Sequence, residues 1–361
     1  MRMKWRYFYE EAFSVVLALL ALNVLTVPTM AETEGDDGND VGYISFLNLS
    51  EEELVSRREA NRLAYQYLGE QGVMERDGQS FPHRSNIFYD SLDAMLMGLL
   101  SGEVDDLDVP DCTAKYLCTT NDQVKQTVFW HPEKADEFSQ QLLNHLGNGY
   151  SFMMLEQNSD LRDQFDQAIA QMKEDGTLEE LIKNHITDAA KSGEPEAIVF
   201  EEFDGEPIKV AVTGCLPPMD YVAADGSFAG FNTAILAEIG KRLEKNIELV
   251  QVDSIGRALA LAQGNVDVVF WTRDGMRGGA RPPMNIEDRE EGSEPVPPKE
   301  RKDPDTLKRE KMEELTEEER AIMTAIDESL KPEKYMQRDM PEGTVTTSPY
   351  YTDMDVLVTL K

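Results

Sequence analysis

Two arginines that follow a predicted buried strand, Arg273 and Arg277, have the chemistry to hold a carboxylate. A guanidinium group donates two parallel hydrogen bonds to one carboxylate, which gives both affinity and orientation. Gly275, Gly278 and Gly279 surround Arg277 and would let the backbone approach a bound solute closely. Structural roles stay open for both arginines, because Arg277 also suits the surface at the start of a loop and Arg273 a structural salt bridge.

Aromatic and acidic side chains could add to such a site. Trp271, at the end of the same strand, and Tyr221 carry rings that stack on a planar or cationic group. Asp108 and Asp111 could hold a cation. Three of these residues also have a structural alternative: core packing for Trp271, an exposed hairpin position for Tyr221, and helix capping for Asp111.

Signatures of catalysis and of metal binding are absent from the sequence. We find no nucleophile elbow, phosphate-binding loop, zinc signature or convincing pair of catalytic carboxylates. The sequence therefore predicts no enzyme, no metal and no cofactor. The histidines lack the spacing of metal ligands, at His83, His131, His145 and His185.

The chain has 361 residues, a formal net charge of −34 and 41% hydrophobic residues. This length suits two domains or one two-lobed domain, and the hydrophobic content is sufficient for a core. The strong negative charge disfavours a nucleic-acid partner, because phosphate contacts require Lys and Arg.

The N-terminus has the pattern of an export signal. A basic start precedes an apolar run from Ala12 to Val27 and a small-residue cleavage pattern at 29–31. The run is shorter than the ~20 residues of a membrane-spanning helix, which favours cleavage. Glu10 and Glu11 are atypical, so an uncleaved signal that associates the chain with the membrane stays open. We expect an extracytoplasmic protein: secreted, periplasmic or at the cell surface.

The three cysteines are Cys112, Cys118 and Cys215. Outside the cell two of them could form a disulfide and leave one over. In a helix, Cys112 and Cys118 would be separated by about 9 Å of rise, which is too far for a disulfide. We expect three buried thiols.

Hydrophobic periodicity predicts alternating strands and helices in the first half of the chain. Strands are expected at 43–47, 87–89, 104–109 and 150–155, and helices at about 51–71, 91–100, from 113, at 159–174 and from 177. The helix at 91–100 carries the apolar stripe Leu92, Met95, Leu96 and Leu99, which we assign to the core.

The second half begins with three strands and two helices over 208–270. Residues 279–305, rich in charge and proline, are expected to be mobile. Leu307–Leu330 could form a polar helix, and Val356–Leu360 a closing strand. A long insertion of this kind costs little when both its ends are anchored at one surface.

Several segments share landmarks with one family of two-lobed proteins. In the second half the segments at 215–232, 258–270 and 348–361 read CLPPMDYVAADGSFAGFN, ALALAQGNVDVVF and SPYYTDMDVLVTLK. In the first half, residues 88–117 read FYDSLDAMLMGLLSGEVDDLDVPDCTAKYL and residues 161–186 read LRDQFDQAIAQMKEDGTLEELIKNHI. The three segments of the second half resemble the first lobe of extracytoplasmic amino-acid-type solute-binding proteins of ABC importers (bacterial family 3 type). The two segments of the first half resemble the second lobe and the C-terminal helix pair of that family.

This resemblance implies an α/β fold of the periplasmic-binding-protein-like type II, with two lobes and a hinge, but with the lobes in reverse order. Two accounts stay open. One is a circular permutant with a single cleft, which we favour because residues 188–206 could join the family's neighbouring termini. The other is the junction of a tandem pair. The expected domains are a signal peptide (1–31), an acidic linker (32–42), a second-lobe-like segment with closing helices (43–187), a linker (188–206) and a first-lobe-like segment (207–361) with a charged insertion (278–342).

The resemblance also implies ligand contacts, and several are altered in this chain. A Thr and an Arg spaced T-x-x-R hold the ligand carboxylate in the family, whereas Thr272 precedes Arg273 directly and Arg277 by five positions. The aspartate that holds the ligand ammonium falls at Pro110, and the stacking ring falls at Met219. The aspartate of the family's Gly-Phe-Asp is Asn232. The candidate ligand-binding residues are therefore Tyr221, Trp271, Thr272, Arg273, Arg277, Asp108 and Asp111.

Two functions follow as hypotheses. The first is a solute-binding protein that closes on a small polar solute, an amino acid or a related compound, and delivers it to the permease of an ABC importer. The second is a degenerate sensory or structural module that keeps the fold and binds no amino acid, which the altered contacts favour. An enzyme on the same scaffold is disfavoured, because no catalytic constellation is present.

Overall fold

The computed structural model describes residues 38–44, 51–78, 83–192, 198–253, 256–274, 312–329 and 343–361. Contacts divide the chain into a short unit, Met1–Gly38, and a main unit, Asn39–Lys361. The expected signal peptide and Arg277 lie outside the described residues. Among the helices described, none is long and apolar enough to cross a membrane.

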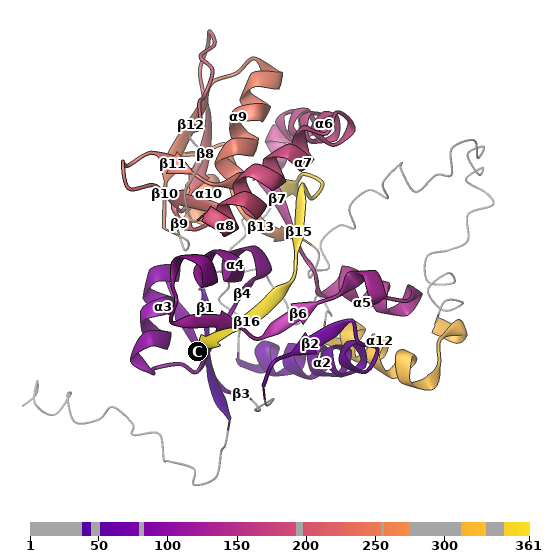
Figure 1. Cartoon of the computed structure of the whole chain (residues 1–361). Coiled ribbons are helices and arrows are strands. Elements are labelled where there is room, and N and C mark those ends of the chain that lie inside the picture. The colour runs from indigo at the N-terminus through magenta and orange to yellow at the C-terminus, as the bar shows by residue number, and fades with distance from the viewer. Residues whose placement is uncertain are drawn as a thin grey trace, which may run out of the picture. The chain divides into compact units, whose positions relative to one another are not determined.

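A five-stranded sheet combines strands from both ends of the main unit, in the order β3-β1-β4-β16-β5. Strand β1 is parallel to β3 and β4, whereas β16 is antiparallel to β4 and β5. We call this sheet, with its helices α3 and α4, the five-stranded lobe (Figure 1). Its elements are β1 (Asn39–Ile44), β3 (His83–Tyr89), α3 (Leu92–Ser101), β4 (Asp106–Pro110), α4 (Asp111–Thr120), β5 (Val124–Gln126) and β16 (Asp355–Leu360).

Helix α3 is fixed at both ends by its own sequence. The Ser91 side chain accepts a hydrogen bond from the backbone N–H of Ala94, and Gly102 closes the helix with φ 78°. Both are favoured end residues, a hydroxyl at the N-cap and a glycine in the left-handed region at the C-terminus. The predicted apolar stripe lies in the core: its members Leu92, Met95 and Leu99 are buried and Leu96 is partly buried.

A second sheet has six strands, in the order β12-β8-β13-β7-β14, with β15 also paired to β7. Strands β12, β8 and β13 are parallel, and β7 is antiparallel to β13, β14 and β15. We call this sheet and its helices the six-stranded lobe. Its elements are β7 (Asn148–Leu155), α6 (Ser159–Glu174), α7 (Thr177–Ile182), a π-helix (Lys183–Asp188), α8 (Ala189–Ser192), β8 (Ile208–Val212), α9 (Phe231–Leu243), β12 (Ile247–Gln251), α10 (Arg257–Ala262), β13 (Val268–Asp274), β14 (Thr344–Thr346) and β15 (Tyr351–Asp353).

Strand β7 joins the two halves of the chain. It comes from the first half, yet it pairs with β13 of the second half, with Met153 opposite Val269 and Ser151 opposite Thr272. Its residues from Asn148 to Met154 are all buried, as expected for a central strand covered on both faces. The pairing means that residues 148–155 and 208–274 belong to one sheet of one chain.

Two chain segments pass from one sheet to the other. The first runs from helix α5 (Glu137–Leu146) through Gly147 into β7, and the second runs from β15 through Met354 into β16. A Cβ atom on Gly147 would lie 3.1 Å from Cγ2 of Thr352 in β15. The two crossings therefore lie against each other, and the first has no room for a larger residue.

The remaining elements lie beside these sheets. A three-stranded antiparallel sheet follows β8, and a two-stranded sheet and the helices α2, α5 and α12 lie beside the five-stranded lobe (Figure 1). These elements are β9 (Cys215–Leu216), β10 (Asp220–Val222), β11 (Phe228–Ala229), α2 (Glu51–Glu70), β2 (Met74–Arg76), β6 (Val128–Trp130), the 3-10 turns Pro132–Lys134 and Glu156–Asn158, and α12 (Glu317–Ser329).

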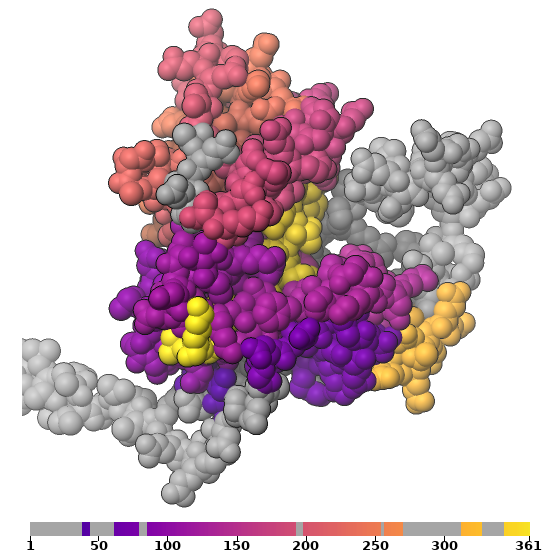
Figure 2. All heavy atoms as spheres, viewed as in Figure 1, coloured from indigo at the N-terminus to yellow at the C-terminus, as the bar shows by residue number. Residues whose placement is uncertain are grey.

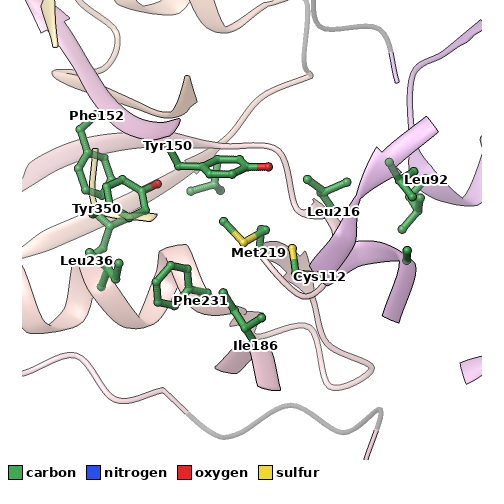
Figure 3. Packing of buried hydrophobic residues seen from close by; sticks show 14 of the residues in the cluster. Leu92, Cys112, Tyr150, Phe152, Ile186, Leu216, Met219, Phe231, Leu236 and Tyr350 are labelled. Carbon is green, nitrogen blue, oxygen red and sulfur yellow. The ribbon is translucent and has the colours of Figure 1, made fainter. Parts of the chain in front are cut away.

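The largest apolar core runs through both lobes. It contains Leu92, Met95 and Cys112 of the five-stranded lobe together with Phe152 and Phe231 of the six-stranded lobe. Leu216 and Met219 belong to the same cluster, and Figure 3 shows Met219 between Cys112 and Phe231. Buried apolar area is the main driving force for folding, so the two lobes stabilise each other.

Several boundaries differ from those expected. Strand β1 begins at Asn39 rather than at Tyr43, because Asn39 and Asp40 already pair with β3. The closing helices continue to Ser192, past the expected end at 187. Within the range expected as one helix, Leu307–Leu330, residues 312–314 are helical and α12, Glu317–Ser329, begins separately after its cap Thr316. Residues 307–311 and 330 lie outside the described residues.

The cysteines also differ from expectation. All three are free, but only Cys112 is fully buried, whereas Cys118 and Cys215 are half-buried. The positions of Cys118 and Cys215 next to solvent follow from their places at the end of α4 and at the start of the short strand β9.

Candidate functional site

Helix α4 of the five-stranded lobe faces the six-stranded lobe at its start. Its N-cap is Pro110, which has no side chain that could cap the helix. The carboxylate of Asp353, at the end of β15, does this instead, because its Oδ2 accepts the backbone N–H of Cys112 at 2.9 Å. The backbone N–H of Asp111 donates to the Met354 carbonyl at 2.8 Å. The second crossing is thus tied to the first turn of α4.

Asp353 is buried, at 8% exposure. Burial raises its pKa to about 6, the hydrogen bonds from Cys112 oppose the rise, and the nearby Asp111 carboxylate adds to it. Burial and the Asp353 charge likewise raise the pKa of the Cys112 thiol well above its usual value. The thiol is therefore un-ionised near neutral pH and acts as a small apolar group.

A second contact between the lobes is aromatic. Tyr221 lies in β10, is 8% exposed, and its ring centroid lies 6.1 Å from that of Tyr116 in α4. Burial raises the pKa of Tyr221 to about 12, with a smaller contribution from Tyr116. Both phenols stay protonated at neutral pH and can donate a hydrogen bond, while their faces can stack on a planar or cationic group.

The loop that carries Tyr221 is held by a buried carboxylate. Asp220 accepts hydrogen bonds from the backbone N–H of Thr213 at 2.7 Å and of Gly214 at 3.0 Å. Burial raises the pKa of Asp220, and these hydrogen bonds oppose the rise. Gly214 has φ 71°, in the region that favours glycine. The position of Tyr221 is therefore fixed by its neighbours in sequence and by the end of β8.

Apolar side chains fill the region beside this aromatic pair. Leu216, the last residue of β9, and Met219, in the loop between β9 and β10, are completely buried. They share one core cluster with Cys112 and Leu92, which come from the other lobe and are 1% and 2% exposed. Figure 3 shows Met219 beside Cys112, and Leu216 on the side of Leu92. This part of the boundary between the lobes is therefore packed with protein side chains.

The structure brings some of the predicted site residues to this boundary. Tyr221 meets α4, and Asp111 is the first residue of α4. The Asp111 carboxylate accepts hydrogen bonds from Lys115 and, at 2.8 Å, from Gln126 Nε2, so its charge is already partnered. Asp111 does not cap the helix, as one interpretation had it, because the N-cap residue is Pro110 and the Asp353 carboxylate supplies the capping acceptor. Asp108 lies in β4 opposite Leu357 and is half-buried.

The remaining predicted residues lie on or after β13. The backbones of Thr272 and Arg273 pair with Ser151 and Tyr150 of β7. The side chains of Trp271, Thr272 and Arg273, and the whole of Arg277, lie outside the described residues. Their roles as ligand contacts stay predictions.

Sequence reasoning missed Tyr116 and Asp353. Tyr116 occupies an ordinary position within a short helix, and only its contact with Tyr221 distinguishes it. Asp353 follows a Thr in the closing segment, and a signal existed in principle: Pro110 cannot cap α4, so another acceptor was required at that helix start.

Metal ligands are not gathered in the part of the chain that the structure describes, where no group of three or more His, Cys, Asp or Glu side chains could hold an ion. The polar groups described at the boundary between the lobes include the phenols of Tyr116 and Tyr221, carboxylates that already accept hydrogen bonds, and the Thr119 hydroxyl, which donates to the Ala190 carbonyl. This set is suited to binding.

Comparison with known families identifies one part of the chain. Residues 208–273 match the bacterial extracellular solute-binding proteins, family 3. The match covers β8 to β13, including the loop with Tyr221. The match lies in one of two α/β lobes joined by two crossings, so the chain has the predicted α/β fold of two lobes. No curated protein matches the sequence.

The chain is also similar, at low identity, to solved structures of ligand-binding proteins. The zinc-bound ligand-binding component of an ABC-type import system from Staphylococcus aureus has 8% identity and a TM-score of 0.34, over 89% of this chain and 65% of that one. The alkanesulfonate-binding protein SsuA from Xanthomonas axonopodis pv. citri, bound to MOPS, has 10% identity and a TM-score of 0.29, over 66% and 55%. The GluR0 ligand-binding core with L-glutamate has 9% identity and a TM-score of 0.32, over 90% and 85%.

The chain thus spans 65% and 55% of the length of the first two of these proteins. Zinc, a sulfonate buffer and glutamate are chemically unlike one another. Similarity at this level identifies no ligand for the present chain.

Proposed function

We propose that this chain is an extracytoplasmic solute-binding protein that captures a small polar solute, an amino acid or a related compound, for an ABC importer. The observation that carries the proposal is the family match at 208–273, whose loop brings Tyr221 against Tyr116 of the other lobe. Binding without catalysis is the chemistry that this boundary supports.

The hinge supports the same proposal. Lobes joined by two short crossings can rotate about them and close over a solute, and a permease can then recognise the closed form. Here the crossings lie at Gly147 and Met354, side by side. Opening would separate Tyr116 from Tyr221 and admit a solute between the rings, where stacking and the nearby carboxylates favour a planar or positively charged group.

We also propose that the chain is a circular permutant of the family with one binding site. The pairing of β7 with β13 supports this account, because it places residues from the first half of the chain and the family-matched segment in one sheet. A tandem arrangement would instead pair each half with a segment of another domain. Limited proteolysis within 193–207, followed by a test of whether the fragments stay together, distinguishes the two accounts.

The binding function is tested by thermal-shift screening of the purified chain with amino acids, polyamines and small organic anions. We expect one of these classes to raise the unfolding temperature. Tyr221→Ala should remove that rise, whereas Leu259→Ala, at a residue that is 59% exposed on α10, should keep it. A folded wild-type protein whose unfolding temperature is unchanged by every class would contradict the proposal.

A second candidate is a degenerate module that keeps the fold and binds no amino acid. The specific observation in its favour is the apolar packing of Leu216 and Met219 against Cys112 and Leu92, which fills part of the boundary with protein atoms. Purification from native membranes separates the candidates: an importer permease among the co-purifying proteins supports solute delivery, and a different membrane partner supports the degenerate module.

A further inference from the structure

Helix α12 is a well-defined helix within the charged insertion. Its first turn has a reciprocal capping arrangement, in which Thr316 Oγ1 accepts the Glu319 N–H at 3.2 Å and Glu319 Oε2 accepts the Thr316 N–H at 2.8 Å. Such a capping box fixes a helix start from local sequence alone. The Arg320 guanidinium adds hydrogen bonds to the carbonyls of Met312 and Leu315 at 2.9 and 2.8 Å. Hydrogen bonds within residues 312–320 therefore specify the helix start.

The apolar face of α12 docks on α2. Ile322 and Ile326, 3% and 1% exposed, lie in a core cluster separate from the main core, together with residues of α2 and α5. Tyr67 of α2 donates a hydrogen bond to Glu319 Oε1 at 3.3 Å. Figures 1 and 2 show α12 (orange) alongside α2 (indigo). The cluster members are Ala64, Tyr67, Leu68 and Val73, then Phe138, Leu142, Leu143 and Leu146, and Ile322 and Ile326.

The same cluster reaches both crossings between the lobes. Leu146, 3% exposed, is the last residue of α5 and directly precedes Gly147 of the first crossing. Met354 of the second crossing is partly buried against the cluster. Packing on one side of the cluster therefore affects the freedom of the backbone at the hinge.

The insertion leaves and rejoins the chain on the other lobe. Before it, Asp274 of β13 pairs with Gly149, and after it, Thr344 of β14 pairs with Leu155, both in β7 of the six-stranded lobe. Helix α2, by contrast, connects β1 and β3 of the five-stranded lobe. The helix thus starts from one lobe and packs beside the other, and the covalent link makes its docking an intramolecular event with a high effective concentration.

We propose that α12 is a removable brace of the hinge: docked on α2 within this cluster it stiffens the two crossings, and released it lets the lobes rotate. The brace acts in the absence of any solute. It therefore holds for a solute-binding protein and for a degenerate module alike.

Hydrogen exchange of the full chain tests the brace at two backbone amides of the hinge. The Gly147 N–H donates to the Leu143 carbonyl and the Asp111 N–H to the Met354 carbonyl, both at 2.8 Å. The Asp267 N–H donates to the Lys209 carbonyl at 2.8 Å within the six-stranded lobe, and it serves as the internal reference. One variant replaces residues 312–329 by a Gly/Ser linker of equal length, and a milder one is Ile326→Ala. Glu317→Gln, at an exposed position of the same helix, is the matched control.

In the linker variant we expect hydrogen exchange at the Gly147 and Asp111 amides to accelerate about tenfold or more, while exchange at the Asp267 amide is unchanged. In Ile326→Ala we expect a smaller acceleration at the same two amides. A factor of ten corresponds to about 1.4 kcal/mol in the opening equilibrium. Unchanged exchange at both hinge amides in a folded linker variant would overturn the proposal. Loss of folding in that variant would also overturn it, because α12 would then be an obligatory part of the core rather than a brace.

Discussion

The carboxylate of Asp353 accepts a hydrogen bond from the backbone N–H of Cys112 at 2.9 Å, and this bond joins the second crossing of the hinge to the start of α4. The other oxygen of Asp353 accepts the N–H of Met354, also at 2.9 Å. One side chain thus orders both the crossing strand and the helix of the five-stranded lobe that faces Tyr221.

Asp353 should make stability depend on pH. Its folded pKa of about 6 lies above the value of ~3.9 for an unfolded aspartate, so the folded state holds the proton more tightly. Its contribution to the free energy of unfolding is then fully present below about pH 4 and is lost as pH rises through about 6, a change on the order of 3 kcal/mol. Urea unfolding of wild type and Asp353→Asn at several pH values between 4 and 7 measures this difference.

The Asn variant should lack that decline with pH. Asp77→Asn, at an exposed carboxylate paired with Lys125, is the control and should follow the wild-type profile. Parallel profiles for wild type and Asp353→Asn would show that Asp353 titrates alike in the folded and unfolded states.

The rings of Tyr116 and Tyr221 should be energetically coupled. Their centroids lie 6.1 Å apart across the two lobes, and aromatic pairs of this kind contribute about 0.5–1.5 kcal/mol beyond their buried area. A double-mutant cycle with Tyr116→Ala and Tyr221→Ala, measured by urea unfolding without solute, gives the coupling energy. Additive effects of the two substitutions would mean that the rings do not meet in solution.

Gly214→Ala should destabilise the loop of Tyr221. A Cβ at this position would lie 2.9 Å from Gln251 Nε2 and 3.0 Å from Val222 Cγ2, and φ is +71°. Gly264 has a similar φ of +69° but nothing within 4 Å, so Gly264→Ala isolates the backbone cost. We expect Gly264→Ala to lower the free energy of unfolding by about 1–2 kcal/mol and Gly214→Ala to lower it by about 1–3 kcal/mol more. Urea unfolding measures both losses. Equal losses would indicate that the neighbours of Gly214 move freely.

Met219 should behave as a core residue. It is 0% exposed among Leu216, Cys112 and Leu92, so truncation should cost about 2–5 kcal/mol. Met97→Ala, the same substitution at a site that is 62% exposed, should stay within about 0.5 kcal/mol of wild type. A comparably small effect of Met219→Ala would mean that the lobes are open at this point in solution and that the apolar packing does not block a solute.

The sequence predicted much of the fold because its local signals agree. The apolar stripe of α3, its serine N-cap and its glycine end all point to one helix, and the structure has it. A strand was likewise expected at 150–155, and β7 runs from Asn148 to Leu155. Boundaries were less predictable where pairing decides them: β1 starts at Asn39, since its first residues are ordered by β3 rather than by their own β propensity.

The site was less predictable because it depends on contacts between distant residues. Tyr221 could be singled out from its loop, but its partner Tyr116 lies 105 positions earlier in sequence, within an unremarkable helix. Asp353 acts on Cys112 across 241 positions. These contacts depend on how the chain crosses between the two sheets, and no local sequence pattern predicts that path.

On the proposed function, a solute binds between the two lobes at Tyr116 and Tyr221. Isothermal titration of the intact chain with the compound that most raises its unfolding temperature tests this directly. We predict about one binding site per chain and an affinity that falls about tenfold or more, at least 1.4 kcal/mol, in Tyr116→Ala. An unchanged affinity in folded Tyr116→Ala, or the absence of saturable heat with the wild-type chain, would contradict the account.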